Sequence, residues 1–197
     1  MLDPVFVESR IEEFKRDLKT KDNIHMVSKY FYNDYEPAAI NLDTYHALRW
    51  EIKEHFNLES IFDVFLVGSA RLGFSIKPTD QFRYFNDQSD LDVVIVSKPL
   101  FEEYWKAARD STISLEEWKH QGVYEDYFFK GWMRPDKLRY GGEELDVKKG
   151  WQFFGKLSQS RKYGPYPING GLYYSLDFLE HYQTDAIERI RTFGEML

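Results

Sequence analysis

Residues 89–97 read SDLDVVIVS, and the order of charged and apolar residues in this stretch predicts much of the fold. Its apolar second half, Val93–Val96, predicts a strand that is buried on both faces. Asp90 and Asp92 lie two residues apart, so an extended backbone points both carboxylates to the same side. Two like charges at the mouth of an apolar strand repel each other and lose hydration. The pair therefore indicates either a bound cation or the ordinary alternative, a loop cap beside an ion pair.

A second apolar run, IFDVFLVGS at 61–69, predicts a strand that stops at a glycine. Gly68 allows close approach to a ligand, and the amides that follow it, with the Ser69 hydroxyl, can surround phosphate oxygens. A Gly-Ser turn after a strand is also common without any function. A hard divalent cation such as Mg²⁺ binds through one or two carboxylates plus substrate phosphates. Together, the turn and the Asp-x-Asp pair predict a phosphate site beside a metal site.

This pairing resembles the nucleotidyltransferases of the DNA polymerase β-like superfamily. The resemblance covers about residues 45–100 and is carried by Gly68-Ser69, with Gly73 completing the turn, and by Ser89-Asp90-Leu91-Asp92. It implies an enzyme that uses two metal ions, Mg²⁺ or Mn²⁺. Such an enzyme moves a nucleoside monophosphate from a nucleoside triphosphate such as ATP to an acceptor and releases pyrophosphate. Paired metals suit this reaction because phosphoryl-type transfer mainly needs in-line positioning and neutralised charge.

The resemblance also implies roles for individual residues. Asp90 and Asp92 would be catalytic residues that hold the metals against the triphosphate. The Ser69 hydroxyl and the neighbouring amides would bind the β- and γ-phosphates, and Arg71 would add positive charge at the leaving group. The implied nucleotide-binding residues are then Gly68, Ser69, Arg71, Gly73 and Ser89.

Two features depart from the pattern of the superfamily. Members usually supply a third carboxylate from a later strand, and the triplet Leu145-Asp146-Val147 makes Asp146 the catalytic candidate by pattern. Asp177, at the end of the late strand, is better explained as a helix N-cap. In addition, an insertion at 75–88 separates Ser69 from Asp90. Its charged and aromatic side chains either clamp the base or triphosphate, or pack onto the surface: Lys77, Phe82, Arg83, Tyr84 and Phe85.

Periodicity outside these motifs predicts an α+β, or mixed α/β, fold. Helices are expected at about 5–20, 43–56, 101–110, 114–120 and 148–159, with a final helix over 179–193, and strands at 61–69, 91–97 and 171–176. The resemblance implies a small nucleotidyltransferase-type sheet flanked by helices. Because no linker or repeat interrupts the chain, residues 1–197 are expected to form a single domain. Its motif core would lie at about 45–100, followed by a helical and late-strand extension at 101–197.

Composition narrows the classes of function. A formal charge of −7 argues against attraction of the whole protein to nucleic acid. Between Lys130 and Lys162, however, nine Lys/Arg face four Asp/Glu, which suits a small phosphate ligand or a strand end, or forms solvated helix faces. The absence of cysteine excludes disulfides and thiolate zinc sites. Neither a leader-like start nor an apolar window of membrane length is present, so a cytoplasmic protein without a membrane partner is expected.

The expected partner is a nucleoside triphosphate, and the acceptor is not identified by the sequence. An RNA end, a protein hydroxyl, a small molecule and another nucleotide are all candidates. By resemblance, small stand-alone members of the superfamily often act in bacterial toxin–antitoxin or phage-defence systems. The alternative is a catalytically inactive member that binds nucleotides or a protein partner, because Asp146 has no clear strand context.

Overall fold

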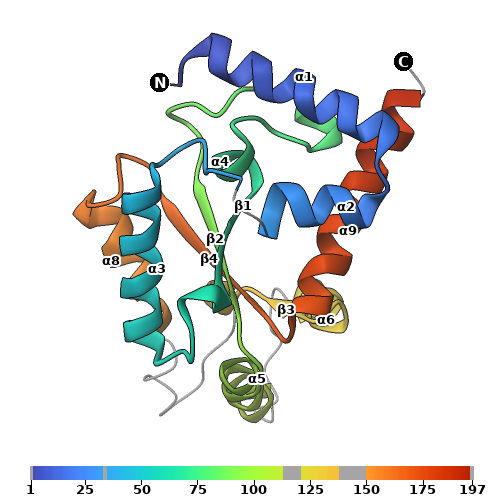
Figure 1. Ribbon diagram of the computed structural model, residues 1–197. Coiled ribbons are helices and arrows are strands. Elements are labelled where there is room, and N and C mark those ends of the chain that lie inside the picture. The colour runs from blue at the N-terminus through green and yellow to red at the C-terminus, as the bar shows by residue number, and fades with distance from the viewer. Residues whose placement is uncertain (1, 33–34, 113–120, 138–149, 196–197) are drawn as a thin grey trace.

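The apolar run after Asp92 forms β2 (Leu91–Val96) at the centre of a four-stranded mixed sheet, in a computed structural model that describes residues 2–32, 35–112, 121–137 and 150–195. The strand order is β1-β2-β4-β3. β1 (Val64–Val67) pairs antiparallel with β2, β2 pairs parallel with β4 (Ile168–Tyr173), and β3 (Trp132–Met133) pairs antiparallel with β4. Helices cover both faces of this sheet, which confirms the α+β class (Figure 1).

The helices range from 5 to 20 residues, and their bounds in chain order follow. They are α1 (Pro4–Thr20), α2 (Asn23–Val27), α3 (Leu42–Phe56), α4 (Gly68–Leu72), α5 (Lys98–Thr112), α6 (Gln121–Phe129), α8 (Phe153–Ser160) and α9 (Leu176–Glu195). A π-helical turn, Ser28–Tyr32, continues α2, and 3₁₀ turns occur at Ile61–Asp63, Pro78–Asp80 and Pro135–Lys137. In the described part of the chain, no helix is both long and apolar enough to cross a bilayer.

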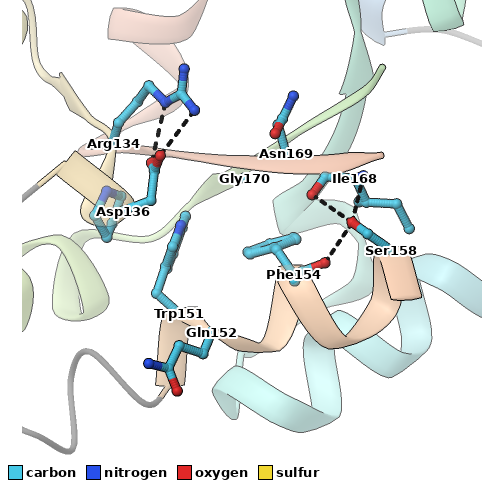
Figure 2. A pocket seen from close by; sticks show the side chains of 11 residues that line it. Arg134, Asp136, Trp151, Gln152, Phe154, Ser158, Ile168, Asn169 and Gly170 are labelled. Carbon is cyan, nitrogen blue, oxygen red and sulfur yellow. Dashed lines mark hydrogen bonds and ion pairs between the residues drawn. The ribbon is translucent and has the colours of Figure 1, made fainter. Parts of the chain in front are cut away.

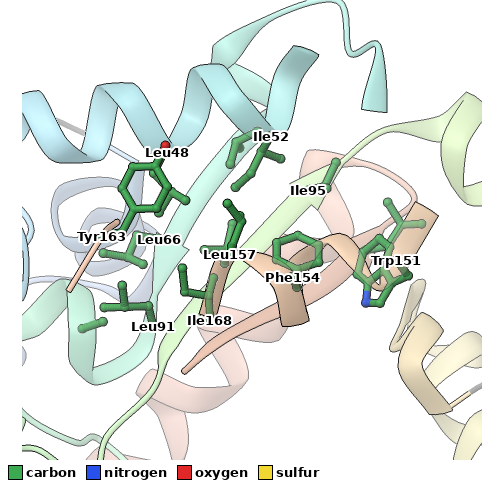
Figure 3. Packing of buried hydrophobic residues seen from close by; sticks show 14 of the residues in the cluster. Leu48, Ile52, Leu66, Leu91, Ile95, Trp151, Phe154, Leu157, Tyr163 and Ile168 are labelled. Atoms are coloured by element: carbon green, nitrogen blue, oxygen red, sulfur yellow. The ribbon is translucent and has the colours of Figure 1, made fainter. Parts of the chain in front are cut away.

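Side chains of β2 alternate between two hydrophobic clusters, as a strand buried on both faces requires. Leu91, Val93 and Ile95 join the cluster under α3 and α8, which Figure 3 shows. Val94 joins the cluster under α1, α2 and α9 on the other face. Asp90 and Asp92 lie an even number of positions before Val94, so the alternation places their side chains on the same face of the sheet as Val94. They lie at the start of the apolar run.

The first two predicted helices are confirmed, although one cap differs. α1 begins after Asp3, whose side chain accepts a hydrogen bond from the Val5 amide. The second predicted helix, at 43–56, is α3, but its N-cap is Asn41 rather than Asp43 or Thr44. The Asn41 Oδ1 accepts from the Thr44 amide at 2.8 Å. Asn is as effective a cap as Asp, and its extended backbone leaves Asp43 free to lie in the first helical turn.

Two predicted strand boundaries are wrong. The strand predicted at 61–69 is β1, which is shorter because Ser60 caps a 3₁₀ turn over Ile61–Asp63 and Gly68 already begins α4. The strand predicted at 171–176 is β4, but it begins at Ile168, and Asp177 lies in the first turn of α9 rather than at its N-cap. The predicted helix at 114–120 and the candidate Asp146 lie outside the described residues.

The early start of β4 depends on packing rather than on local propensity. A Cβ built on Gly170 would lie 2.4 Å from Phe154 Cε2 and 2.7 Å from Trp151 Cζ2. The rings of Phe154 and Trp151 therefore pack against the strand at Gly170, where there is room only for a glycine. Glycine inside a strand usually signals a turn or bulge, so the local sequence around 167–170 favours a turn while tertiary packing selects a strand.

We expect Gly170→Ala to destabilise the protein by about 1–3 kcal/mol, because the new methyl group overpacks two buried rings. Gly171→Ala is the matched control, since its Cβ would meet Val94 Cγ1 at an ordinary 3.6 Å. Urea denaturation of both variants measures the difference in the free energy of unfolding. Equal stability of the two variants would contradict this account of the start of β4.

Candidate functional site

The structure brings the Gly-Ser turn and the paired carboxylates together. β1 pairs with β2 in a register that sets Val67 opposite Asp92, so Gly68 follows directly beside that carboxylate. A Cβ on Gly68 would lie 3.4 Å from Asp92 Oδ2. Gly68 has a φ of +65°, a left-handed conformation that glycine adopts without steric cost. The side-by-side arrangement predicted from GSARLG and SDLDVVIV is therefore present.

A third polar side chain, Asn169 of β4, completes this group. β2 and β4 pair in parallel with Asp92 opposite Asn169, and Asn169 Nδ2 donates a hydrogen bond to Asp90 Oδ2 at 3.0 Å. Sequence reasoning misses Asn169 because the predicted strand begins only at residue 171, whereas β4 begins at Ile168. The available signal was the β-branched Ile168 directly after Pro167, where a strand can begin. We call Asp90, Asp92 and Asn169 the carboxylate–amide group.

The electrostatics of this group favour a cation. Burial, reinforced by the negative charge of Asp90, raises the pKa of Asp92 above its usual value. The amide of Asn169 and the positive charges of Lys77 and Arg134 lower the pKa of Asp92, and burial outweighs them. An ionised Asp92 is therefore under-compensated by the protein itself, and a bound cation would stabilise it.

The donor set suits a hard divalent cation. Two carboxylates and an amide oxygen are the ligand types that Mg²⁺ and Mn²⁺ take, and Mg²⁺ commonly binds through only one or two carboxylates. Within the described ranges, no group of three or more Asp, Glu, His or Cys side chains is placed to hold a metal. A third carboxylate near Asp90 and Asp92 is therefore not supplied by these residues, and Asp146 lies outside them.

The other predicted nucleotide-binding residues of the turn shape its backbone. Ser69 is partly exposed in the first turn of α4, and its carbonyl accepts from the Gly73 amide at 2.8 Å. Gly73 ends α4 with a φ of +92°, and a Cβ there would lie 3.1 Å from Ala38. Ser89 is buried in the turn before β2, where its Oγ accepts from the Asn86 amide at 3.1 Å. Of the three, Ser69 is the one that is partly exposed, whereas Gly73 and Ser89 are buried.

Arg71 is not brought to the carboxylates. It is 4% exposed, and its Nε donates to the Tyr30 carbonyl at 3.3 Å. Its guanidinium lies 5.9 Å from the centre of the Tyr45 ring and lines a separate cavity of about 550 Å³ that also includes Arg49. The positive charges that act on Asp92 are Lys77 and Arg134 instead. The position of Arg71 thus gives no support to the predicted role at the leaving group.

Most of the insertion at 75–88 packs against the fold. Phe85 is buried, and Phe82 packs its ring against Phe14 and Phe74. Tyr84 donates to Glu8 of α1, and Arg83 pairs with Asp80 at 3.0 Å. These contacts favour the packed-loop alternative for the aromatic residues and Arg83. Lys77 differs, because it is exposed and its charge lowers the pKa of Asp92.

We predict that Asp92→Asn changes the pH dependence of stability in metal-free buffer. A raised pKa in the folded state means that wild-type stability is greatest below the unfolded pKa of Asp and falls as pH rises through the folded pKa. Asn169 and the backbone remain, so the variant should gain stability relative to wild type between acidic and neutral pH. Urea denaturation with EDTA at several pH values measures this gain. The control is Asp80→Asn at an exposed ion pair, and a pH-independent difference for Asp92→Asn would refute the prediction.

Comparison of the chain with protein-family profiles, with curated protein sequences and with solved structures gave no match in any of the three searches.

Proposed function

We propose that this protein is a metal-dependent nucleotidyltransferase that moves a nucleoside monophosphate from a nucleoside triphosphate to an acceptor. The observation that carries the proposal is the position of the Gly68 turn beside Asp92, in a group that also includes Asp90 and Asn169. A turn suited to phosphate and a carboxylate pair suited to Mg²⁺ or Mn²⁺ are then one site. The resemblance to the DNA polymerase β-like superfamily supports the same reaction.

Each residue of the proposed site has a physical task. Asp90 and Asp92 would bind the divalent cation, which when bound neutralises charge on the triphosphate and leaving group. The Gly68-Ser69 turn offers backbone amides and one hydroxyl to phosphate oxygens. Lys77 and Arg134 add positive charge on the flanks. Asn169, by donating to Asp90 Oδ2, holds one carboxylate in place and keeps its own carbonyl oxygen available as a ligand.

Label transfer tests the proposal. The protein is incubated with each α-labelled ribonucleoside triphosphate, Mg²⁺ or Mn²⁺, and a panel of RNA, protein and small-molecule acceptors that includes the protein itself. We expect metal-dependent label transfer and pyrophosphate release. If neither exceeds the level of an Asp92→Asn variant across the panel, the enzyme proposal fails.

A second candidate is a nucleotide-binding module without turnover, and Asn169 is the observation that favours it. Asn169 occupies the strand position beside both aspartates, where a carboxylate would complete a stronger metal site, and an amide cannot act as a general base. Such a module would bind metal–nucleotide without pyrophosphate release. Thermal shift with Mg²⁺ and each triphosphate, measured in the same samples, separates the candidates because only ligands of the folded state raise its stability.

A further inference from the structure

Part of the outer edge of β4, next to the strand position of Asn169, is not paired with another strand among the described residues. β3 contains only two residues and pairs with Leu172 and Tyr173. Ahead of them, the edge at Ile168 is capped by a side chain, since Ser158 Oγ accepts from the Ile168 amide at 2.8 Å. The same hydroxyl donates to the Phe154 carbonyl at 2.8 Å and lies 3.3 Å from the Ile168 carbonyl. Between these two points, no strand among the described residues covers the edge.

The hydrogen-bonding pattern shows which backbone groups face this gap. Pro167 and Tyr173 turn their carbonyls toward β2, where they accept from Leu91 and Ser97. Odd-numbered residues of β4 therefore face β2 and even-numbered ones face outward, because the direction alternates along a strand. Ile168 and Leu172 use their outward groups on Ser158 and β3. The N–H and C=O of Gly170 also point outward, but they form no hydrogen bond with any of the described residues.

These two groups face a cavity of about 400 Å³ between β4, α8 and the Pro135–Lys137 turn (Figure 2). Trp151 and Phe154 form its apolar wall, and the Arg134–Asp136 ion pair, with nitrogen and oxygen 3.0 Å apart, forms its polar wall. In Figure 2 the Asn169 side chain lies on the opposite side of β4 from the two rings. The aromatic wall of the cavity thus lies on the α8 face of β4. Asn169 and the carboxylates point to the other face, and β2 lies one strand spacing of about 4.8 Å away in the sheet.

A glycine on α8 keeps the cavity open. Gly155 and Ser158 lie three residues apart on one face of α8, and both line the cavity, together with Trp151, which precedes the helix. A Cβ on Gly155 would meet nothing within 4 Å. Glycine lowers helix stability relative to alanine. Gly155 therefore weakens α8 slightly, and its lack of a side chain leaves space in front of Gly170.

The open edge is too short for a peptide strand. A strand that adds to a sheet edge forms several alternating bonds, whereas Gly170 offers a single donor–acceptor pair between two occupied positions. A flat ring with an adjacent donor and acceptor on one edge, and apolar faces, matches both the pair and the aromatic wall. Nucleobases present such an edge.

We propose that this cavity binds a nucleobase of the substrate, which pairs with the backbone N–H and C=O of Gly170. The inference rests on the proposed function, because it assigns the nucleotide part of a substrate whose phosphates lie at Gly68 and Asp92. The base belongs either to the donor triphosphate or to a nucleotide acceptor, and both sources present the same edge chemistry.

Gly155→Phe tests the cavity without touching the carboxylates, because a large side chain from that helix face fills the space before Gly170. Gly155→Ala is the matched control at the same position. Gly122→Phe in α6, where a Cβ also meets nothing within 4 Å, is the control for an added aromatic residue. Circular dichroism melts check that all three variants fold.

The readout is binding of the four ribonucleosides without phosphate or metal, followed by saturation-transfer NMR. We expect wild type, Gly155→Ala and Gly122→Phe to bind at least one nucleoside through its base protons. Gly155→Phe should bind it about tenfold or more weakly, since it loses two buried hydrogen bonds. Absence of nucleoside binding to wild type, or equal binding to Gly155→Phe, would overturn the proposal.

Competition identifies the source of the base. A non-hydrolysable triphosphate with Mg²⁺ displaces the nucleoside if the cavity holds the donor base, and both bind together if it holds the acceptor base. The proposed function is judged separately. Nucleoside binding that Gly155→Phe removes, without any label transfer, keeps the cavity and rejects the enzyme. Label transfer with unchanged KM values for donor and acceptor in Gly155→Phe keeps the enzyme and rejects the cavity.

Discussion

Asp92→Asn and Asp90→Asn should each lower nucleotidyl transfer by about a thousandfold or more, because a metal ion contributes several kcal/mol of charge stabilisation in phosphoryl transfer. The Asn side chains keep the volume and one ligand oxygen but remove the negative charge that binds the cation. Initial rates of pyrophosphate release at saturating triphosphate and Mg²⁺ measure the effect.

Loss of fold does not explain such a result. Burial and the charge of Asp90 already raise the pKa of Asp92, so Asp92→Asn should raise the metal-free stability at neutral pH. Asp80→Asn removes a charge from an exposed ion pair in the insertion at 75–88, and this variant serves as the activity control. Variants at Asp90 and Asp92 that retain more than a tenth of the wild-type rate would remove these carboxylates from the proposed mechanism.

Asn169→Asp should produce the second large effect. It should strengthen metal binding but destabilise the metal-free protein. A third carboxylate beside Asp90 and Asp92 should raise the affinity for Mn²⁺ by about tenfold or more, since an anionic ligand replaces a neutral one. Without metal, the added like charge should destabilise the fold at neutral pH. Calorimetric titration with Mn²⁺ and urea denaturation in EDTA measure the two effects.

Asn169→Ala provides the control for the lost amide. It removes the hydrogen bond to Asp90 Oδ2 without adding charge, so its Mn²⁺ affinity should not exceed that of wild type. Unchanged Mn²⁺ affinity in Asn169→Asp would show that position 169 lies outside metal-binding distance. A gain in transfer rate in Asn169→Asp, beside tighter metal binding, would identify the amide as the element that limits turnover.

Local sequence predicted the half of the site that comes from β1 and β2. The apolar runs before Gly68 and after Asp92 are strands in any packed context, because only burial on both faces explains them. Their order along the chain also predicted the Gly-Ser turn beside the carboxylates, and the antiparallel pairing of β1 with β2 confirms that placement. The close position of Gly68 beside Asp92 follows from that register.

The half that comes from β4 could not be predicted in this way. Asn169 lies between an isoleucine and two glycines, a sequence that locally favours a turn. Trp151 and Phe154 of another segment pack onto Gly170 and leave no room for a side chain. Arg71 shows the reverse case, because its place in the motif suggests a phosphate ligand while packing directs it to the Tyr30 carbonyl.

The sequence by itself determined the two central features of this protein, the buried strand β2 and the paired carboxylates ahead of it, because hydrophobic periodicity and charge are local properties. Only the tertiary structure decided which residues join those carboxylates. Asn169, Lys77 and Arg134 come from three separate segments, and the gap at Gly170 exists because β3 ends after two residues. Such positions depend on strand register and on side-chain packing between distant segments, and these arise only when the whole chain folds.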